Sequence, residues 1–168
     1  GISTNTDRIV QIALIGSNST GDTVHYETLV NPRRPIPPGA SGVHGIFDSD
    51  VKGEQDFRHH ADEIHRLIEN SVVVGHNIRK FDMPLLENEF RRIGRLPPKP
   101  KAMMDTLEIV RRVKLGRPHN LGSLCRRHGI SLENAHTAAA DAAASLLLFW
   151  RLTTVSYTHL TLPTTYHV

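Results

Sequence analysis

Three polar side chains in two short stretches have the types that metal-assisted hydrolysis needs. The first stretch, VVVGHNIRKFDMPLLENEF, carries Asp82, and the second, NAHTAAADAAASLLLF, carries His136 and Asp141. Carboxylate oxygens are ligands that hard divalent cations such as Mg²⁺ prefer. A histidine with an ordinary pKa near ~6.5 can be neutral at working pH and take a proton from water. Together the three residues predict hydrolysis assisted by a divalent cation.

Asp82 lies between a predicted strand and a predicted helix. The apolar run SVVVG at residues 71–75 is typical of a buried strand, and Pro84 suits the first turn of the helix that follows. In α/β sheets, ligands bind in the loops that follow the carboxyl ends of strands. A carboxylate at a helix N-terminus is also favoured by the helix dipole, by roughly 0.3–1 kcal/mol. A simple helix-capping role for Asp82 therefore stays open.

Asp141 lies inside a helix-forming segment rich in Ala and Leu, at residues 135–152. If that helix is buried, the carboxylate needs a partner or a metal ion. Helical spacing puts Asp141 on the same face as Ala144, Ser145 and Leu148. The small side chains beside it leave room for a ligand to approach. The alternative is a tolerated surface Asp on an amphipathic helix.

The elements that would position these residues follow strand and helix patterns in turn. Turn residues at 16–22 join two strands into an antiparallel hairpin, and the Pro-rich segment 31–40 predicts a loop. The order of elements predicts an α/β fold with a sheet of mixed strand directions. The predicted strands are residues 8–15, 23–30 and 71–77, and the predicted helices are residues 56–70, 82–94 and 135–152. A strand is predicted to run into a helix at residues 101–113. A short helix is predicted at residues 120–130 and ends at Gly129.

Composition restricts the class of protein. The 168 residues fit one domain, on a prior of ~100–200 residues per domain. The single cysteine, Cys125, excludes an internal disulfide and favours a reducing cytoplasm. There is no apolar run of ~18 residues that could span a membrane, and no signal-peptide pattern. We therefore expect a cytoplasmic domain with no membrane partner.

Basic residues are concentrated at residues 91–128, where only Asp105 and Glu108 oppose them. The net charge of +3 and the pI near 9.3 permit an anionic partner. This segment is either a solvated face or a surface that follows a phosphate backbone, and charge alone leaves both open. The basic residues are Arg91, Arg92, Arg95, Lys99, Lys101, Arg111, Arg112, Lys114, Arg117, Arg126 and Arg127.

The chain resembles the DEDDh 3′→5′ exonucleases, a DnaQ-like family that contains the proofreading epsilon subunit of bacterial DNA polymerase III and ribonuclease T. The stretch HNIRKFD resembles the second motif of the family, with Asp82 as a metal ligand. HTAAAD resembles the third motif, with His136 as general base and Asp141 as metal ligand. VNPRRPIPPGASGVHGI and MMDTLEIVRR are similar to other stretches common in the family.

This resemblance implies an RNase H-like fold, with a mixed sheet flanked by helices. It implies two Mg²⁺ or Mn²⁺ ions about 4 Å apart, and a water, deprotonated by His136, that attacks the terminal phosphodiester and releases a nucleoside monophosphate. Family position also puts His44 and Asn77 near the substrate, although a structural turn at His44 and a loop-backbone role for Asn77 stay open. The implied partners are single-stranded DNA or RNA 3′ ends and a DNA polymerase.

The first motif of the family, Asp-x-Glu-Thr-Thr-Gly, is absent from the sequence. In the family it ends the first strand and supplies two of the four acidic ligands, and Gly1 aligns best with its last glycine. We therefore expect residues 1–152 to be an exonuclease domain that lacks its N-terminal strand, with weak or single metal binding and impaired activity.

Residues 153–168, with six Thr and no Lys, Arg, Asp or Glu, are expected to be an atypical tail, either foreign to the domain or a natural β-prone extension. Such a tail could fill the slot of the missing strand. The function we expect is a DNA proofreading-type exonuclease. The alternatives are an RNA 3′→5′ exonuclease and a non-catalytic nucleic-acid-binding module.

Overall fold

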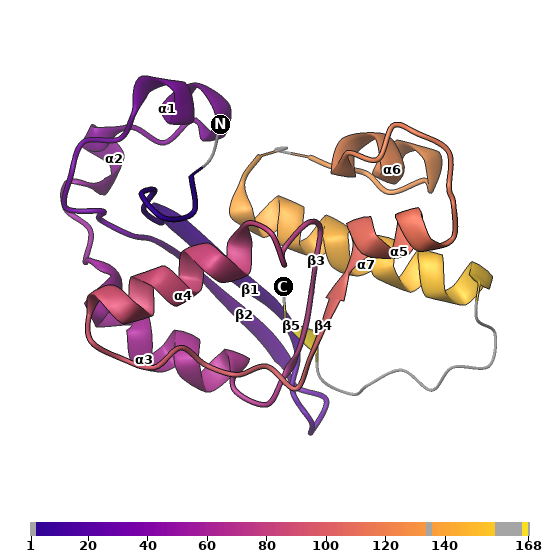
Figure 1. Cartoon of the computed structure of the whole chain (residues 1–168), viewed down its shortest axis with the longest axis horizontal. Coiled ribbons are helices and arrows are strands. Elements are labelled where there is room, and N and C mark those ends of the chain that lie inside the picture. Colours follow the sequence, from indigo (N-terminus) through magenta and orange to yellow (C-terminus); the bar gives the residue numbers. More distant parts are fainter. Residues whose placement is uncertain (1–2, 134–135, 157–165, 168) are drawn as a thin grey trace.

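A mixed sheet lies between two layers of helices in the computed structural model, which describes residues 3–133, 136–156 and 166–167 (Figure 1). The strand order is β2-β1-β5-β3-β4. β1 is antiparallel to β2 and β5, whereas β3 is parallel to β4 and β5. The predicted sheet of mixed strand directions is therefore confirmed. The strands are β1 (Gln11–Ser17), β2 (Thr23–Leu29), β3 (Val72–Gly75), β4 (Ala102–Asp105) and β5 (Tyr166–His167).

The predicted hairpin is formed by β1 and β2, which pair from Gln11 opposite Leu29 to Ser17 opposite Thr23. Its turn is closed by Asn18, whose Oδ1 accepts hydrogen bonds from the backbone N–H groups of Thr20 and Asp22. An Asx side chain that bonds its own backbone two residues on favours such a turn.

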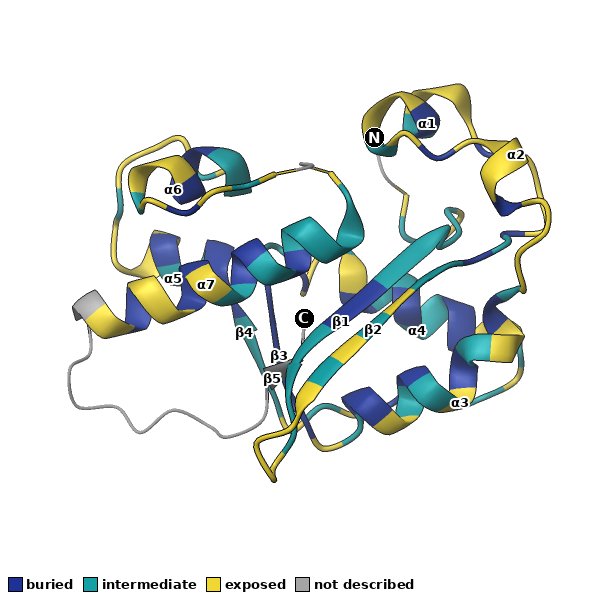
Figure 2. Cartoon of the chain, turned by 180° about the vertical axis from the view of Figure 1, so that it is seen from behind, coloured by how far each residue is buried: buried dark blue, intermediate teal, exposed yellow. Residues whose placement is uncertain are grey.

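The helices cover both faces of the sheet. α3 (Phe57–Ile68) and α4 (Asp82–Arg92) pack on one face, and α7 (Ala138–Ser156), with α5 (Thr106–Arg112) and α6 (Leu121–Arg127), packs on the other (Figure 2). β3 shows why both layers are needed. Val73 joins the core under α3 and α4, while Val72 and Val74 pack against Phe149 of α7. Alternating side chains point to opposite faces of a strand, so β3 is buried on both, as predicted.

Two short helices, α1 (Pro38–His44) and α2 (Asp48–Val51), occur where no helix was predicted. The predicted loop at 31–40 is therefore wrong over its last three residues. Pro38 occupies the first position of α1, where a missing N–H costs nothing because that N–H has no partner within the helix. Gly45, with a φ of 71°, ends α1. Gly129, with a φ of 68°, follows α6 and confirms the predicted end of that helix.

α7 continues four residues beyond Leu152, to Ser156, although the helical pattern was expected to stop there. The hydroxyl of Thr153 donates to the carbonyl of Phe149 at 2.9 Å, and that of Thr154 donates to the carbonyl of Trp150 at 2.6 Å. Both hydroxyls are thereby satisfied inside the helix, and Thr153 is buried. Of the expected tail, residues 157–165 and 168 lie outside the described residues, as do Gly1 and Ile2 at the start of the sequence.

β5 occupies the place between β1 and β3 that we considered for a β-prone tail. Tyr166 pairs with Ser17 on one side and with Val72 on the other, and His167 pairs with Val73. In the described part of the chain, no helix is both long and apolar enough to cross a membrane.

Candidate active site

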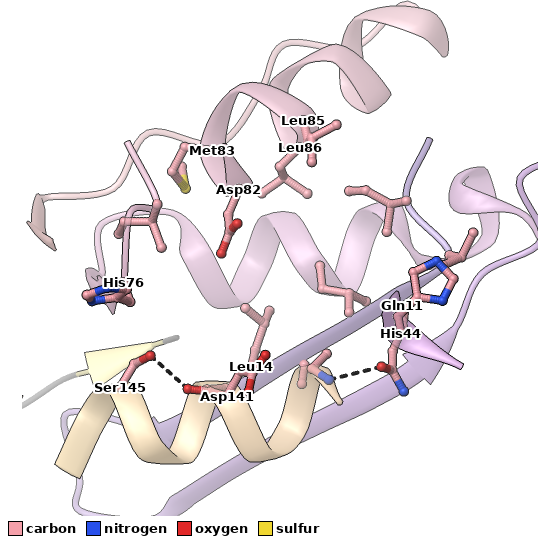
Figure 3. Close-up of a pocket in the computed structure, with 18 of the residues that line it drawn as sticks. Gln11, Leu14, His44, His76, Asp82, Met83, Leu85, Leu86, Asp141 and Ser145 are labelled. Atoms are coloured by element: carbon pink, nitrogen blue, oxygen red, sulfur yellow. Dashed lines mark hydrogen bonds between the residues drawn. The ribbon is translucent and has the colours of Figure 1, made fainter. Parts of the chain in front are cut away.

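A cavity of about 500 Å³ lies at the carboxyl end of β3, between α4, α7 and β1. Asp82, Asp141 and His44 line it (Figure 3), and so does His136. They come from the first turn of α4, the segment before α7, the first turn of α7 and the last residue of α1. Asn77 is not among the lining residues. Four of the five residues singled out from the sequence therefore meet around one space.

Asp82 is the first residue of α4, directly after the N-cap residue Phe81, so its carboxylate lies in the first turn, where the helix dipole favours it. Its carboxyl group is directed into the cavity (Figure 3). Asp82 remains exposed because the cavity is open to solvent. The protein around the cavity nevertheless displaces part of the bulk water that would solvate its carboxylate. Burial, first of all, and the negative charges of Asp105 and Asp141 together raise the pKa of Asp82 to about 6. Such a carboxylate gains from a nearby positive charge.

The turn after β3 determines where α4 begins. Gly75 has no room for a side chain, because a Cβ there would lie 2.2 Å from Cγ2 of Ile78. Asn77 has a φ of 60°, and its N–H donates to Oδ1 of Asp105 at 2.8 Å. The N–H of Arg79 donates to the other oxygen at 3.3 Å. The backbone of Asn77 thus shapes the turn.

Asp105 holds this turn together with the start of α5. It is buried at 3% exposure, and its Oδ1 also accepts from the N–H of Leu107 at 3.0 Å as the N-cap of α5. Three backbone groups from two segments therefore share one carboxylate. This position matches the strand–helix junction that residues 101–113 predict.

Asp141 is held at the start of α7 by the segment that precedes it. The backbone N–H of His136 donates to its Oδ1 at 3.3 Å. Burial raises the pKa of Asp141, while this hydrogen bond and the proximity of His136 act in the opposite direction. The predicted neighbours on its helix face, Ala144, Ser145 and Leu148, are all buried. Asp141 is therefore part of an inward-facing surface, which argues against the tolerated surface Asp.

Gln11, which no local sequence pattern singles out, fixes the start of α7. Its Oε1 accepts a hydrogen bond from the backbone N–H of Ala138 at 2.9 Å (Figure 3). The first N–H groups of a helix have no partner inside the helix, so a side chain from β1 satisfies one of them. The strand and the helix that carries Asp141 are joined by this contact.

His76 is a second lining residue that sequence reasoning missed, although it lies in the GHN stretch. Burial lowers its pKa, which favours the neutral ring. A carbonyl can only accept, so Nε2–H donates to the carbonyl of His119 at 2.8 Å. Nδ1 lies 2.8 Å from the hydroxyl oxygen of Thr106, which is also 3.2 Å from the carbonyl of Gly75. This tautomer follows from the hydrogen-bond network, and it makes His76 a brace between β3 and α5.

His44 both closes a turn after α1 and lines the cavity. Its Nδ1 accepts a hydrogen bond from the N–H of Ile46 at 3.0 Å, which closes the turn around Gly45. The ring also lines the cavity, and burial lowers its pKa. A turn-forming role and a position beside the candidate site are therefore compatible.

The donor set for a metal ion is incomplete. The Asp82 and Asp141 carboxylates have the oxygen chemistry of a hard-cation site. Among the residues that the structure describes, however, no group of three or more His, Cys, Asp or Glu side chains is arranged to hold a metal ion. Within the described residues, the carboxylates of Asp82 and Asp141 line the cavity without a third such side chain grouped with them.

The basic segment divides into two parts. On and after α4, Arg91, Arg92 and Arg95 pair with Glu87, Glu89 and Asp62, at 3.5, 2.9 and 2.6 Å. Around α5 and α6, no basic residue of the segment has a carboxylate partner among the described side chains. We call this second part the α5–α6 basic face: Arg111, Arg112, Lys114, Arg117, Arg126 and Arg127, all exposed.

Comparison with known families gives a match over most of the chain. The family RNase_T, described as exonuclease, matches residues 1–149. The chain belongs to this exonuclease family. The resemblance to DnaQ-like 3′→5′ exonucleases is thereby confirmed.

Curated relatives of this family are larger proteins. A DNA polymerase III subunit epsilon-like protein of Rhodobacter capsulatus is 34% identical over 157 residues, covering 89% of this chain and 21% of the relative. A 3′-5′ exonuclease DinG of Staphylococcus epidermidis is 32% identical over 145 residues, covering 84% and 16%. A PolC-type DNA polymerase III of Halalkalibacterium halodurans is 29% identical over 153 residues, covering 90% and 10%. The chain thus spans a tenth to a fifth of these relatives.

Solved structures of exonucleases share the fold. Escherichia coli Exonuclease I, in complex with a dA16 oligonucleotide, has a TM-score of 0.79 at 21% identity, covering 94% of this chain and 39% of that one. Exonuclease X, in complex with 5′-overhanging duplex DNA, has a TM-score of 0.65 at 24% identity, covering 88% and 84%. The expected α/β architecture, a mixed sheet flanked by helices, is therefore the one that exonuclease domains have.

Proposed function

We propose that this chain is a 3′→5′ exonuclease domain that hydrolyses the terminal phosphodiester of single-stranded DNA and releases nucleoside monophosphates. The observation that carries the proposal is the meeting of Asp82, His136 and Asp141 at one cavity of an exonuclease-family fold. Asp82 comes from one segment and His136 and Asp141 come from another, so the meeting of the two segments is a property of the fold. His44 and Asn77 are proposed to lie along the bound 3′ end.

In this proposal His136 takes the proton from the attacking water. Its backbone N–H donates to Asp141, which keeps the two residues adjacent at the start of α7. Asp82 and Asp141 would hold Mg²⁺ or Mn²⁺, which when bound would neutralise phosphate charge and make water a better nucleophile. Below pH about 6 a proton competes with the cation for Asp82, because burial and its acidic neighbours favour the protonated form.

We further propose that the 168-residue chain alone is impaired. Two unit charges 4 Å apart interact by ~4 kcal/mol at an effective dielectric near ~20, so two divalent ions repel by roughly 16 kcal/mol. Four carboxylates can offset that repulsion, whereas Asp82 and Asp141 alone supply two. Weak or single cation binding follows, with little turnover. The Asp-x-Glu strand of the family would bring the other two.

The preference for DNA rests on relatives whose names or structures refer to DNA. An RNA exonuclease would use the same three residues. The candidate from another class is a non-catalytic nucleic-acid-binding module. It is favoured by the α5–α6 basic face, which has no carboxylate partner among the described side chains, and by the incomplete donor set. In that case binding would persist while hydrolysis stayed absent.

A nuclease assay separates these candidates. The 168-residue chain and a form preceded by a strand that ends in Asp-x-Glu are incubated with 5′-labelled single-stranded DNA or RNA, with Mg²⁺ or Mn²⁺. We expect little turnover by the first protein, and stepwise shortening of DNA from the 3′ end by the second. Faster degradation of RNA would transfer the proposal to RNA.

The variants His136→Ala and His25→Ala in the extended form provide the matched test. His136→Ala should lower kcat by about 10²–10⁴-fold, while His25→Ala, at an exposed position on β2, should leave it unchanged. Absence of turnover by the extended form would overturn the exonuclease proposal, and robust turnover by the 168-residue chain would overturn the proposed impairment.

A further inference from the structure

β2 is an outer edge of the sheet, and alternate backbone groups along it face away from β1 (Figure 2). Val30, directly after β2, donates its N–H to the carbonyl of Val10 at 2.8 Å. Because the hydrogen-bonding side alternates along an antiparallel pair, the N–H and C=O groups of Val24, Tyr26 and Thr28 face β1. The groups that face outward therefore belong to the residues between them, Thr23, His25, Glu27 and Leu29. In the described part of the chain, no strand pairs with this outward edge.

The outward edge of β2 has defined ends. Before it, residues 18–22 close the hairpin turn, and beyond it the N–H of Asn31 donates to the carbonyl of Gln55 at 2.9 Å. Between these limits β2 contains neither proline nor lysine, and it pairs with β1 residue for residue, without a bulge, from Thr23 to Leu29. Proline, lysine and bulges are common devices that prevent pairing at the edge of a sheet. This seven-residue edge therefore has the geometry to accept a further strand.

A second copy of β2 fits this edge in a register that uses its whole length. Two antiparallel copies related by a two-fold axis through Tyr26 put Thr23 of each opposite Leu29 of the other, so all seven residues pair. In this register, residues with outward backbone groups lie opposite one another and can exchange N–H···O=C bonds. A slip by one residue would turn core-facing side chains to the wrong face of the sheet. A slip by two residues would leave positions at the ends of the strands without a partner.

The same register sets complementary side chains opposite each other. Val24 and Tyr26 pack on the core under α3, whereas His25 and Glu27 are exposed on the other face of β2. Within one chain, Nε2 of His25 lies 3.2 Å from Oε2 of Glu27, so the two groups already interact. With the axis through Tyr26, His25 of each copy lies opposite Glu27 of the other, and its ring N–H can donate to that carboxylate. An axis through Glu27 would instead set two carboxylates opposite one another, which is destabilising.

We propose that this protein forms a two-fold symmetric dimer in which the β2 strands of two copies pair about Tyr26, so that one sheet continues through both protomers. Such a contact is closed, because the same surface of each copy is used by the other. Among the residues that the structure describes, none from β2 lines the cavity of the candidate site, so pairing leaves both cavities open. The dimer is therefore independent of hydrolysis. A seven-residue strand pair is a small interface, and we expect weak, concentration-dependent association.

Sedimentation equilibrium of the 168-residue chain over a series of concentrations measures the association. We expect the average mass to rise from 18.8 kDa toward twice that value, without larger species. Amide exchange identifies the strand: the N–H groups of His25 and Glu27 should exchange more slowly as the concentration rises, whereas that of Tyr26, which faces β1, should be protected throughout. A mass of 18.8 kDa at every concentration, or exchange at His25 and Glu27 that does not change with concentration, would overturn the proposal.

Exchanging the two side chains tests the register. His25→Glu sets two carboxylates opposite each other and Glu27→His sets two imidazoles opposite each other, and the symmetry makes each change act twice. We expect either variant to raise the Kd of the dimer by about tenfold or more. Combining the two changes restores a His–Glu pair at both positions and should recover most of the lost affinity. Glu133→His, at an exposed position outside β2, is the control and should leave the Kd unchanged. Unchanged affinity in the single variants, or no recovery in the double variant, would contradict the proposed pairing.

Discussion

Oε1 of Gln11 accepts the backbone N–H of Ala138 at 2.9 Å, so the first residue of β1 satisfies the first residue of α7. The two residues are 127 positions apart. Because Asp141 lies one turn further along α7, the position of this carboxylate depends on a strand near the other end of the chain. The side chain of Gln11, which is not one of the three candidate catalytic and metal-binding residues, thus orients part of the candidate site.

Replacing Gln11 should loosen this connection. Gln11→Ala leaves the N–H of Ala138 without a protein partner, and we expect a loss of about 0.5–1.5 kcal/mol in the free energy of unfolding, measured by urea denaturation. Gln55→Ala is the control, because Gln55 is exposed and only its backbone carbonyl is used. Equal unfolding free energies for the two variants would show that the contact contributes nothing.

The protonation of Asp82 should couple stability to pH. Burial and acidic neighbours raise its pKa from 3.8 to about 6. Between these pH values the native state keeps a proton that the unfolded state has lost, so this group lowers the free energy of unfolding as pH rises. Asp82→Asn removes the effect. We expect the variant to match the wild type near pH 4, to become relatively more stable up to about pH 6, and then to keep a constant advantage.

The measurement is a series of denaturation curves in a metal chelator. Asp62→Asn serves as the control, because the Asp62 carboxylate is exposed and lies outside the cavity. A difference between Asp82→Asn and wild type that stays constant from pH 4 to pH 7 would contradict the assignment of this titration to Asp82.

Glu89 should be the carboxylate on α4 whose loss costs most. It is 1% exposed, accepts from Nε and Nη2 of Arg8 at 2.7 and 3.2 Å, and also accepts from Arg92 at 2.9 Å. Glu89→Gln leaves two guanidinium groups partly unpaired, and we expect a loss of about 3 kcal/mol in the free energy of unfolding. Glu87→Gln breaks an exposed pair with Arg91 and should cost less than about 1 kcal/mol. Similar losses in both variants would contradict the role of burial.

The α5–α6 basic face should contribute to nucleic-acid binding in a salt-dependent way. If Arg111 and Arg112 each contact one phosphate, replacing both with Ala should reduce the salt slope of single-stranded DNA affinity by about 1.4, since each contact contributes about 0.7. The control is Arg91→Ala, because Arg91 already pairs with Glu87. Fluorescence anisotropy at several salt concentrations measures both. An unchanged slope in the double variant would restore the interpretation of this face as merely solvated.

Most elements of the fold could be predicted because their periodicity is strong. β3 and α7 are examples, since one is continuously apolar and the other is rich in Ala and Leu. α1 could not be predicted, because proline at the first position of a helix and proline in a loop look alike locally. The end of α7 could not be predicted either, because its threonine hydroxyls are satisfied by carbonyls within the same helix.

For the candidate site, residue type and spacing found Asp82, His136 and Asp141, since carboxylates beside apolar elements need an explanation. Gln11 and His76 escaped notice because their partners, Ala138, Thr106 and His119, are distant in sequence. Long-range hydrogen bonds of this kind leave no local pattern. The division of the basic segment also required the structure, because ion pairing depends on which acidic residues lie opposite.

The inner edges of β1 and β3 differ in one further respect from the outer edges of the sheet. An exposed edge can recruit a whole foreign sheet and lead to aggregation. The space between residues 11–16 of β1 and residues 74–75 of β3 has helices on both faces, which exclude the second layer of sheet that fibril growth requires. The geometry that leaves these backbone groups accessible therefore also protects the protein from uncontrolled self-association at this position.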